Sequence, residues 1–278
     1  MVPLHGGRSM RENMKDHRDG DRLRHPKSVT LAGIQLNALN FHQTVAWIVE
    51  HARDGAGGYV CTPNVDYMVR AVRDPEFRHA IVSADLRVPD GMWVIYGSRI
   101  AGHRGLSTVT GRLLPESVGR ALSPEGHSIA LFGGRPGIAD RAARALRQRN
   151  VLVHEAFGPS MGFVVGSPED GAAVARLRES PARVVFVALG APKQEMWMAA
   201  HTDELAGKVL VGVGAAIDVL GGRVREAPRW LTSLGLEWAF RLAQEPRRLS
   251  RRYLWDDPRF LWWMIQERMG QTRTFKDS

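Results

Sequence analysis

The sequence predicts an α/β fold: a Rossmann-like, mostly parallel sheet flanked by helices, with a small N-terminal β-hairpin and a helical C-terminal appendage. Short apolar runs alternate with segments of helical periodicity, which is typical of successive βα units. The runs Val184–Leu189 and Val209–Val213 are apolar throughout, as expected for strands buried on both faces of a parallel sheet. The chain has 278 residues, 44% of them hydrophobic, and can therefore bury a full core.

Strands are predicted where an apolar run ends at turn-forming residues. In chain order they are Val29–Leu31, Ile34–Leu36, Tyr59–Thr62, Leu86–Val88, Ser128–Phe132, Val151–His154, Val184–Leu189 and Val209–Val213. Gly33 separates the first two, which we interpret as the hairpin. Helices are predicted where apolar residues recur at helical spacing. They are Thr44–Arg53, Pro75–Ser83, Met92–Ile100, Leu113–Leu122, Ile138–Gln148, Ala172–Glu179, Gln194–His201 and Trp230–Leu242.

The chain divides into three predicted segments. Residues 1–27 are polar and lack the apolar stretch of a signal peptide, so we expect a disordered basic tail. Residues 28–235 form the α/β core and residues 236–278 the appendage. No stretch of about 18 consecutive apolar residues occurs, so no membrane-spanning helix is expected.

The single cysteine, Cys61, allows no internal disulfide and suits a reducing cytoplasm. Its thiol is expected to pack in the strand rather than react.

The appendage combines arginines with large aromatic side chains. The formal net charge of the chain is +9, which favours anionic partners such as phosphorylated substrates, a membrane surface or nucleic acid. Five of the eight tryptophans lie in its last fifth, namely Trp230, Trp238, Trp255, Trp262 and Trp263. Indole and guanidinium groups on one surface suit a membrane interface, and the alternative is a helix that packs its tryptophans into the core. Asp257 followed by Pro258 predicts a helix start here.

Polar and glycine residues follow several predicted strands, at the edge where open α/β sheets bind their ligands. They are Thr62, Asn64, Asp90, Gly133, Gly134, Lys193, Gln194 and Glu195. The cation, amide and carboxylate after Val184–Leu189 indicate the lip of an active site, and the alternative is a solvated turn that opens a helix. Asp90 lies in a Pro-Asp-Gly loop, which equally suits a turn or capping aspartate. The paired glycines would let backbone amides approach a phosphate or nucleotide.

Two functional classes would each explain part of this pattern. Gly212 and Gly214 supply two-thirds of a dinucleotide-binding fingerprint, but Ile217 stands where the third glycine belongs. A basic nucleic-acid-binding module would explain the net charge, but not the polar residues at strand ends. The Asp-x-Asp element of metal-dependent transferases occurs only at Asp19–Asp21 in the tail, and the histidines show no metal-ligand spacing. We therefore expect no metal.

A series of short motifs runs through the chain from about Val29 to Phe260. In order they are Thr62-Pro63-Asn64, Pro89-Asp90-Gly91, Gly190-Ala191-Pro192-Lys193-Gln194-Glu195 with Trp197, Gly212-Val213-Gly214 with Asp218, Arg225 with Ala227-Pro228, Leu236-Glu237-Trp238 with Arg241, and Glu245-Pro246 with Arg248, Arg251, Arg252 and Tyr253. Together they resemble the WecG/TagA/CpsF glycosyltransferases, also called glycosyltransferase family 26. Each motif is short, but the combination is highly specific and covers nearly the whole chain beyond the tail.

The resemblance implies an inverting, metal-independent transfer of a sugar from a UDP-sugar to a polyprenyl-diphosphate-linked saccharide, in bacterial cell-surface or exopolysaccharide biosynthesis. The sugar would be a hexose or an N-acetylated aminohexose such as N-acetylmannosamine. The enzyme would act in the cytoplasm, as a peripheral protein on the inner face of the cell membrane, and would bind no nucleic acid. Assembly into a homo-oligomer stays open.

The resemblance also implies roles for individual residues. Asp90 matches the base that takes the proton from the acceptor hydroxyl. Thr62, Asn64 and Gln194 match family positions in the pocket and would orient sugar hydroxyls as neutral donors, with Lys193 and Glu195 as further substrate-binding candidates. Gly133 and Gly134 are added as substrate-binding residues because of their glycine-rich turn rather than the resemblance. Guanidinium groups would stabilise the departing diphosphate in the absence of a metal. The candidates are Arg241, Arg248, Arg251 and Arg252.

One stretch departs from the family pattern. Members commonly carry Arg-Val-(Ala/Thr)-Gly-x-Asp after the helix that follows the Asp-Gly loop. The corresponding stretch here begins with Thr108 and ends with Leu113, so both charged positions have changed while the Val-Thr-Gly centre is kept. The candidates to replace the missing guanidinium are Arg104, Arg112 or a later residue.

Overall fold

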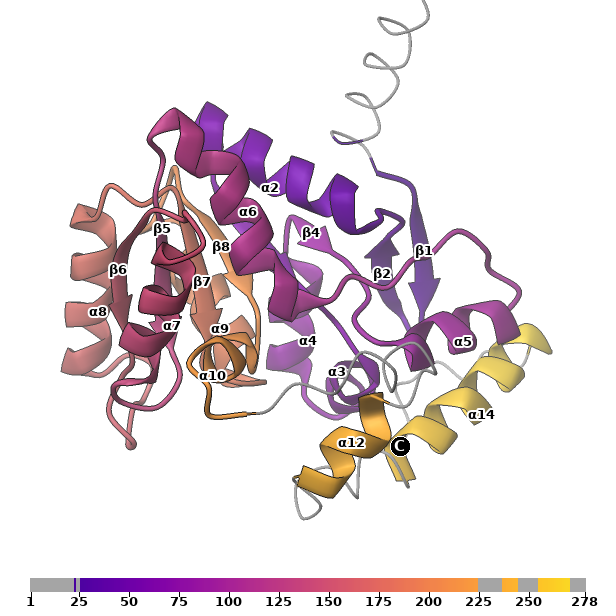
Figure 1. Ribbon diagram of the computed structural model, residues 1–278. Coiled ribbons are helices and arrows are strands. Elements are labelled where there is room, and N and C mark those ends of the chain that lie inside the picture. The colour runs from indigo at the N-terminus through magenta and orange to yellow at the C-terminus, as the bar shows by residue number, and fades with distance from the viewer. Residues whose placement is uncertain (1–22, 24–25, 225–236, 245–254, 271–278) are drawn as a thin grey trace, which may run out of the picture.

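The computed structural model describes residue 23 and residues 26–224, 237–244 and 255–270 (Figure 1). The fold is α/β, with a six-stranded parallel sheet flanked by helices, a two-stranded antiparallel hairpin before it, and helices at the C-terminal side. The predicted fold class is therefore confirmed. The division into tail, core and appendage stays a prediction, because most of residues 1–27 and much of the appendage lie outside the described residues.

The order of the strands brings distant parts of the chain together at one edge. The six strands are β3 (Gly58–Cys61), β4 (Leu86–Arg87), β5 (Ile129–Gly133), β6 (Val153–Phe157), β7 (Val184–Ala188) and β8 (Val209–Gly212). They are arranged β4-β3-β8-β7-β5-β6, and every pair is parallel. The carboxyl ends of β4, β3, β8 and β7 are thus neighbours, which is where ligands bind in open α/β sheets.

The main sheet is buried on both faces because alternate residues of its strands contact different helices. One face packs against α2 (Phe41–Asp54), α6 (Leu114–Leu122), α7 (Ile138–Arg147) and α10 (Ala216–Leu220). The other packs against α8 (Pro168–Glu179) and α9 (Lys193–His201). In β5, Ile129 and Leu131 belong to the first core, whereas Ala130 and Phe132 belong to the second. Short 3₁₀ turns, η1 (Gly111–Leu113) and η2 (Ser123–Glu125), flank α6.

A third core lies beside the sheet, under the hairpin. It joins β1 (Ser28–Leu31) and β2 (Ile34–Asn37) to α3 (Val65–Ala71), α4 (Pro75–Val82), α5 (Met92–Ile100) and α14 (Asp257–Arg268). Figure 1 shows α14 running alongside α5, below the hairpin. The contact is close, because a Cβ atom on Gly97 of α5 would lie only 2.3 Å from the Phe260 ring. Phe260 and Met264 are buried and anchor α14 to the rest of the protein. The helix α12 (Glu237–Gln244) precedes it.

The described tryptophans of the appendage differ in burial, and Trp263 packs against the third core. Trp255 is 74% exposed and Trp262 is 56% exposed, whereas Trp263 is half-buried. The side chains of Trp230 and Trp238 lie outside the described residues.

The helix α14 begins at Asp257, with Asp256 at the N-cap and Pro258 in its first turn, so the predicted start is nearly right. Among the helices that the structure describes, none is long and apolar enough to span a bilayer.

Candidate functional site

Three strand-end loops are joined by hydrogen bonds at the carboxyl edge of the sheet. Thr62, directly after β3, donates its hydroxyl to the backbone oxygen of Gly212 at the end of β8, at 3.2 Å. The backbone N–H of Asp90, after β4, donates to the backbone oxygen of Pro63 at 2.9 Å. The sequence-predicted residues Thr62 and Asp90 therefore lie on adjoining loops, as the prediction of a shared pocket requires.

The loop that carries Asp90 is held from both sides. Besides the Asp90 bond to Pro63, Val109 donates its backbone N–H to Pro89 at 2.8 Å, and Gly91 donates its own to the Thr108 hydroxyl at 2.9 Å. Gly91 has φ of +90°, a conformation that glycine adopts without strain. Asp90 itself is half-buried. Its backbone is thus fixed while its side chain remains within reach of solvent.

Thr108 stands where the family pattern has an arginine, and it bonds the Asp90 loop instead. The same stretch approaches the site further along, since a Cβ atom on Gly111 would lie 3.6 Å from the Thr62 hydroxyl oxygen. Leu113, at the position of the family aspartate, is exposed. Of the two candidate arginines, Arg112 follows Gly111 directly and is half-buried, whereas Arg104 lines a separate cavity described below.

Asn64 caps a helix that the sequence did not predict. It is the N-cap of α3, and its side-chain oxygen accepts the backbone N–H of Tyr67 at 3.4 Å. The side chain is half-buried beside Thr62 and Pro63. The cap fixes the direction of α3, which brings Tyr67 beneath the site.

A buried polar bridge runs from α3 to the turn after β8. The Tyr67 hydroxyl donates to Glu195 Oε1 at 2.6 Å, and Gln194 Nε2 donates to the same oxygen at 2.6 Å. At its other end the Gln194 amide oxygen accepts the backbone N–H of Gly214 at 2.9 Å. Gln194 and Glu195 are both 0% exposed. A larger residue at position 212 would displace the Gln194 amide, because a Cβ atom there would lie 2.5 Å from Gln194 Nε2.

Burial controls the ionisation of this bridge. Loss of solvation raises the pKa of Glu195 to about 7, although the hydrogen bonds from Tyr67 and Gln194 and the charge of Arg70 act to lower it. Burial, together with the Glu195 charge, raises the pKa of Tyr67 well above its ordinary value. The same two causes raise the pKa of the Cys61 thiol, which is buried in β3. The expectation that Cys61 packs rather than reacts agrees with this.

Lys193 points elsewhere, although it is adjacent to Gln194. Its Nζ donates to the backbone oxygen of Phe163 at 2.6 Å and lies 5.7 Å from the centre of the Phe163 ring. It therefore tethers the segment between β6 and α8 to the start of α9. These contacts place its ammonium group beside Phe163.

Gly133 and Gly134 allow the ends of β5 and β7 to approach each other. Their φ angles are +126° and +73°, and a Cβ atom on Gly133 would lie 2.4 Å from the backbone oxygen of Ala188. The Gly134 N–H donates to that same oxygen at 3.0 Å. Close packing of the two strand ends thus accounts for these glycines, and their role toward a substrate stays a prediction.

The four arginines predicted to bind the diphosphate are not placed by the structure. Arg248, Arg251 and Arg252 lie outside the described residues, as does the side chain of Arg241, whose backbone belongs to α12. Among the described residues, no group of three or more His, Cys, Asp or Glu side chains is positioned to hold a metal ion.

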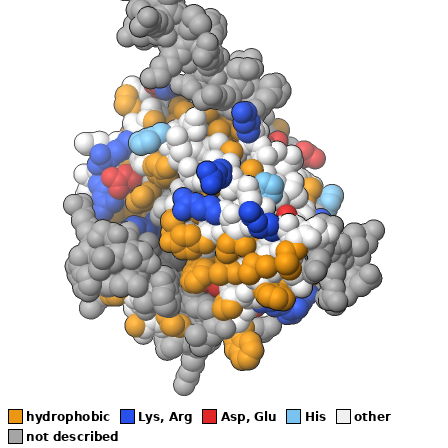
Figure 2. All heavy atoms as spheres, turned by 90° about the vertical axis from the view of Figure 1, so that its right-hand side faces the viewer, with side chains coloured by type: hydrophobic (Ala, Val, Ile, Leu, Met, Phe, Trp, Pro, Cys, Tyr) orange, Lys and Arg blue, Asp and Glu red, His pale blue; other side chains and the backbone are white. Residues whose placement is uncertain are grey.

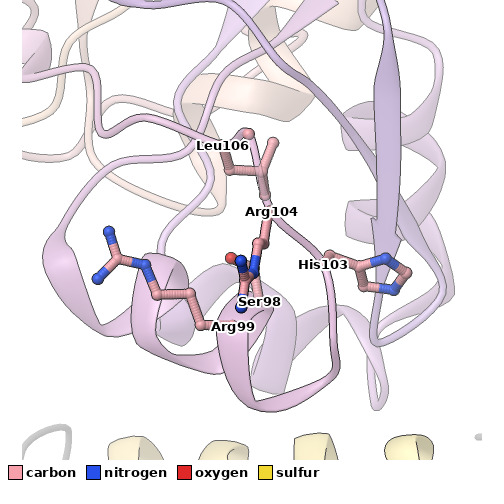
Figure 3. A pocket seen from close by; sticks show the side chains of 6 residues that line it. Ser98, Arg99, His103, Arg104 and Leu106 are labelled. Atoms are coloured by element: carbon pink, nitrogen blue, oxygen red, sulfur yellow. The ribbon is translucent and has the colours of Figure 1, made fainter.

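Two cavities lie away from this site. One, of about 390 Å³, is lined by residues at the end of α5 and in the loop after it, namely Ser98, Arg99, His103, Arg104, Gly105 and Leu106 (Figure 3). In Figure 3 the Arg99 and His103 side chains extend to opposite sides, with Arg104 between them. The other, of about 770 Å³, lies where β5 and β6 begin and is lined in part by Ser128, Val153 and His154. Apart from Arg104, a candidate to replace the missing guanidinium, none of the residues predicted for the site lines either cavity.

An α/β fold with a half-buried carboxylate on a strand-end loop at the carboxyl edge of the sheet is typical of enzymes that bind a polar substrate there. Residues 29–274 match the family model described as "Glycosyl transferase WecG/TagA/CpsF family". The chain belongs to this family of glycosyltransferases, and the resemblance inferred from its motifs is confirmed.

Two contributors to the site were missed from sequence. Tyr67 lies in the largely apolar stretch of α3 and was not predicted to face a carboxylate. Thr108 was noted only as a departure from the family pattern. The available signal for Tyr67 was its spacing, because it follows Asn64 by three residues and therefore lies in the first turn of a helix that Asn64 caps.

Proposed function

We propose that this protein transfers a sugar from a UDP-sugar to a polyprenyl-diphosphate-linked saccharide, with inversion, during synthesis of a cell-surface polysaccharide or exopolysaccharide. The observation that carries the proposal is the meeting of the Thr62 and Asp90 loops at the carboxyl edge of the sheet, in a chain of a glycosyltransferase family. A half-buried carboxylate on a fixed backbone suits a general base, which must reach the acceptor hydroxyl without losing its geometry.

The proposed reaction is a single displacement. The acceptor oxygen attacks C1 of the donor sugar while Asp90 takes the hydroxyl proton, and the C1–O bond to UDP breaks with its electron pair leaving on the diphosphate. Thr62 and Asn64 are proposed to orient sugar hydroxyls. In place of a metal, four guanidinium groups are proposed to stabilise the charge on the departing diphosphate. They belong to Arg241, Arg248, Arg251 and Arg252.

The test is UDP release by the purified full-length chain. UDP-glucose, UDP-N-acetylglucosamine and UDP-N-acetylmannosamine are offered with polyprenyl-diphosphate-linked mono- and disaccharides, with and without a metal chelator. We expect chelator-resistant UDP release with one donor and an inverted anomeric configuration of the product by NMR. The absence of UDP release with every donor and acceptor would overturn the proposal.

We further propose that α5 and α14 form the surface that contacts the membrane. Each helix exposes an apolar stripe at helical spacing. The stripe residues are Met92 and Tyr96 of α5, Trp262 and Ile265 of α14, and Met269, the C-cap residue of α14. Figure 2 shows hydrophobic side chains gathered in a band on this face, with Lys and Arg side chains along its border. Apolar and aromatic side chains beside cations suit an anionic lipid surface, and Arg99, Arg259 and Arg268 are exposed on the same two helices.

Replacing Trp262 and Ile265 together by glutamate is expected to lower binding to anionic vesicles roughly tenfold or more, because two apolar side chains no longer enter the lipid. Co-sedimentation with phosphatidylglycerol vesicles measures the effect. Leu152→Glu is the control, since Leu152 is an exposed apolar residue beside the cavity at the start of β6. Equal losses in the two proteins, or no loss in either, would contradict the assignment of this face.

A further inference from the structure

The orientation of the Gln194 amide is determined by its two neighbours. Gly214 presents an N–H, which only the amide oxygen of Gln194 can accept. Glu195 presents an acceptor, which only the amide nitrogen can bond. A flipped amide would place oxygen against oxygen and N–H against N–H, leaving buried polar groups without hydrogen-bond partners. One amide orientation is therefore strongly favoured.

Tyr67 holds the Glu195 carboxylate in the position where it accepts the Gln194 amide N–H. Its hydroxyl reaches Oε1 at 2.6 Å from α3, while Gln194 and Glu195 are consecutive residues in the first turn of α9. Gln194 Nε2 also lies 3.4 Å from the Tyr67 hydroxyl, so the three polar groups form a compact cluster. The bridge thus connects α3, whose N-cap is Asn64, to the turn at Gly214.

The turn held by this bridge adjoins the proposed catalytic loops. Gly212, two residues before Gly214, accepts the hydroxyl of Thr62, and the backbone N–H of Val213 bonds Val187 of β7 at 2.9 Å. A Cβ atom on Gly111 would lie 3.9 Å from Val213 Cα, so the turn also contacts the stretch that continues from Thr108. A shift of the turn would therefore be transmitted to both Thr62 and the stretch that fixes the Asp90 loop.

We propose that Glu195 and Tyr67 are positioning residues, which lock the Gln194 amide and thereby hold the Val213–Gly214 turn against the loops of Thr62 and Asp90. Gln194 then acts on the proposed substrate site from the protein interior, through the backbone of Gly214. The effect on turnover rests on the proposed function, whereas the effect on the turn does not.

The test compares Glu195→Ala with Glu195→Gln. Alanine removes the acceptor and leaves room for other Gln194 rotamers, whereas glutamine keeps an oxygen that both Tyr67 and Gln194 can bond. In Glu195→Ala we expect amide hydrogen exchange of the peptide containing Gly214 to become about tenfold faster. We also expect kcat to fall about 10²-fold with little change in the affinity for UDP. Glu195→Gln should restore both quantities nearly to wild type, and Tyr67→Phe should move both in the direction of Glu195→Ala, but less.

Trp197→Phe serves as the control for general destabilisation, because it weakens packing on the same helix without touching the bridge. Equal acceleration of exchange in Trp197→Phe and Glu195→Ala would overturn the proposal, and so would unchanged exchange in Glu195→Ala. If the wild-type protein releases no UDP with any donor, the proposed function fails. The exchange measurements then still decide whether Glu195 and Tyr67 hold the turn.

Discussion

Replacing Asp90 by asparagine is expected to lower kcat by about 10²–10⁴-fold while leaving the affinity for UDP nearly unchanged. Asparagine has the shape of aspartate but cannot take the proton from the hydroxyl of the acceptor saccharide. The loop geometry should survive, since three hydrogen bonds that fix it do not involve the Asp90 side chain: Asp90 N–H to Pro63, Val109 N–H to Pro89, and Gly91 N–H to the Thr108 hydroxyl. Steady-state UDP release measures kcat, and isothermal titration calorimetry measures UDP binding.

Asp140→Asn is the matched control for this experiment. Asp140 is an exposed aspartate in the first turn of α7 and takes no part in the site. The control should retain wild-type turnover. Undiminished kcat in Asp90→Asn would exclude Asp90 as the base, and an equal loss of UDP affinity would show instead that Asp90 contributes to donor binding.

Trp197→Ala is expected to lower the free energy of unfolding by about 3–5 kcal/mol. Trp197 is 0% exposed, and its ring centre lies 4.8 Å from that of Phe132 in β5, so alanine leaves a cavity between α9 and the sheet. Its Nε1 also donates to the buried Asp170 carboxylate at 2.6 Å. Removing that donor adds to the cost, although Gly166 and His201 still contact Asp170. Urea unfolding followed by circular dichroism measures the change.

Two variants separate the contributions to this loss. Trp197→Phe keeps an aromatic ring and removes the indole N–H, so it should cost distinctly less than alanine. Trp262→Ala changes an exposed tryptophan and should stay within about 0.5 kcal/mol of wild type. If Trp197→Ala were no more destabilising than Trp262→Ala, the packing of α9 on the sheet would not have the importance we assign to it.

The fold could be predicted from sequence where hydrophobic periodicity was strong. The apolar run Val184–Leu189 became β7 because both faces of that strand are buried, and periodicity reports burial directly. The order of the strands could not be predicted, because pairing of β3 with β8 joins segments far apart in the chain. The short helices α3 and α10 were not predicted, because the residues at their starts are also typical of strand-end loops. The helix α3 can be predicted only when Asn64 is interpreted as an N-cap.

The candidate site could be predicted as a set of loops but not as a set of contacts. Thr62 and Asp90 follow strands of a parallel sheet, so the fold class places both at the same edge, whereas their proximity depends on the pairing of β3 with β4. The roles within Lys193–Glu195 were not, because these residues open α9 and successive helical side chains point about 100° apart. As a result Lys193 reaches Phe163, whereas Gln194 and Glu195 turn into the interior. The sequence also gives no information on which amide end meets Gly214, since that depends on groups from three separate elements.

The packing of α5 against α14 has a consequence for the height of the reaction above the bilayer. Met92, the first residue of α5 and part of its exposed stripe, follows Asp90 by two residues, so their Cα atoms are at most about 7 Å apart. If the stripe rests on lipid, the proposed base sits almost at the level of the headgroups. The attacked hydroxyl must then lie equally low, and a stiff, elongated saccharide would carry its terminal hydroxyl above the reach of Asp90.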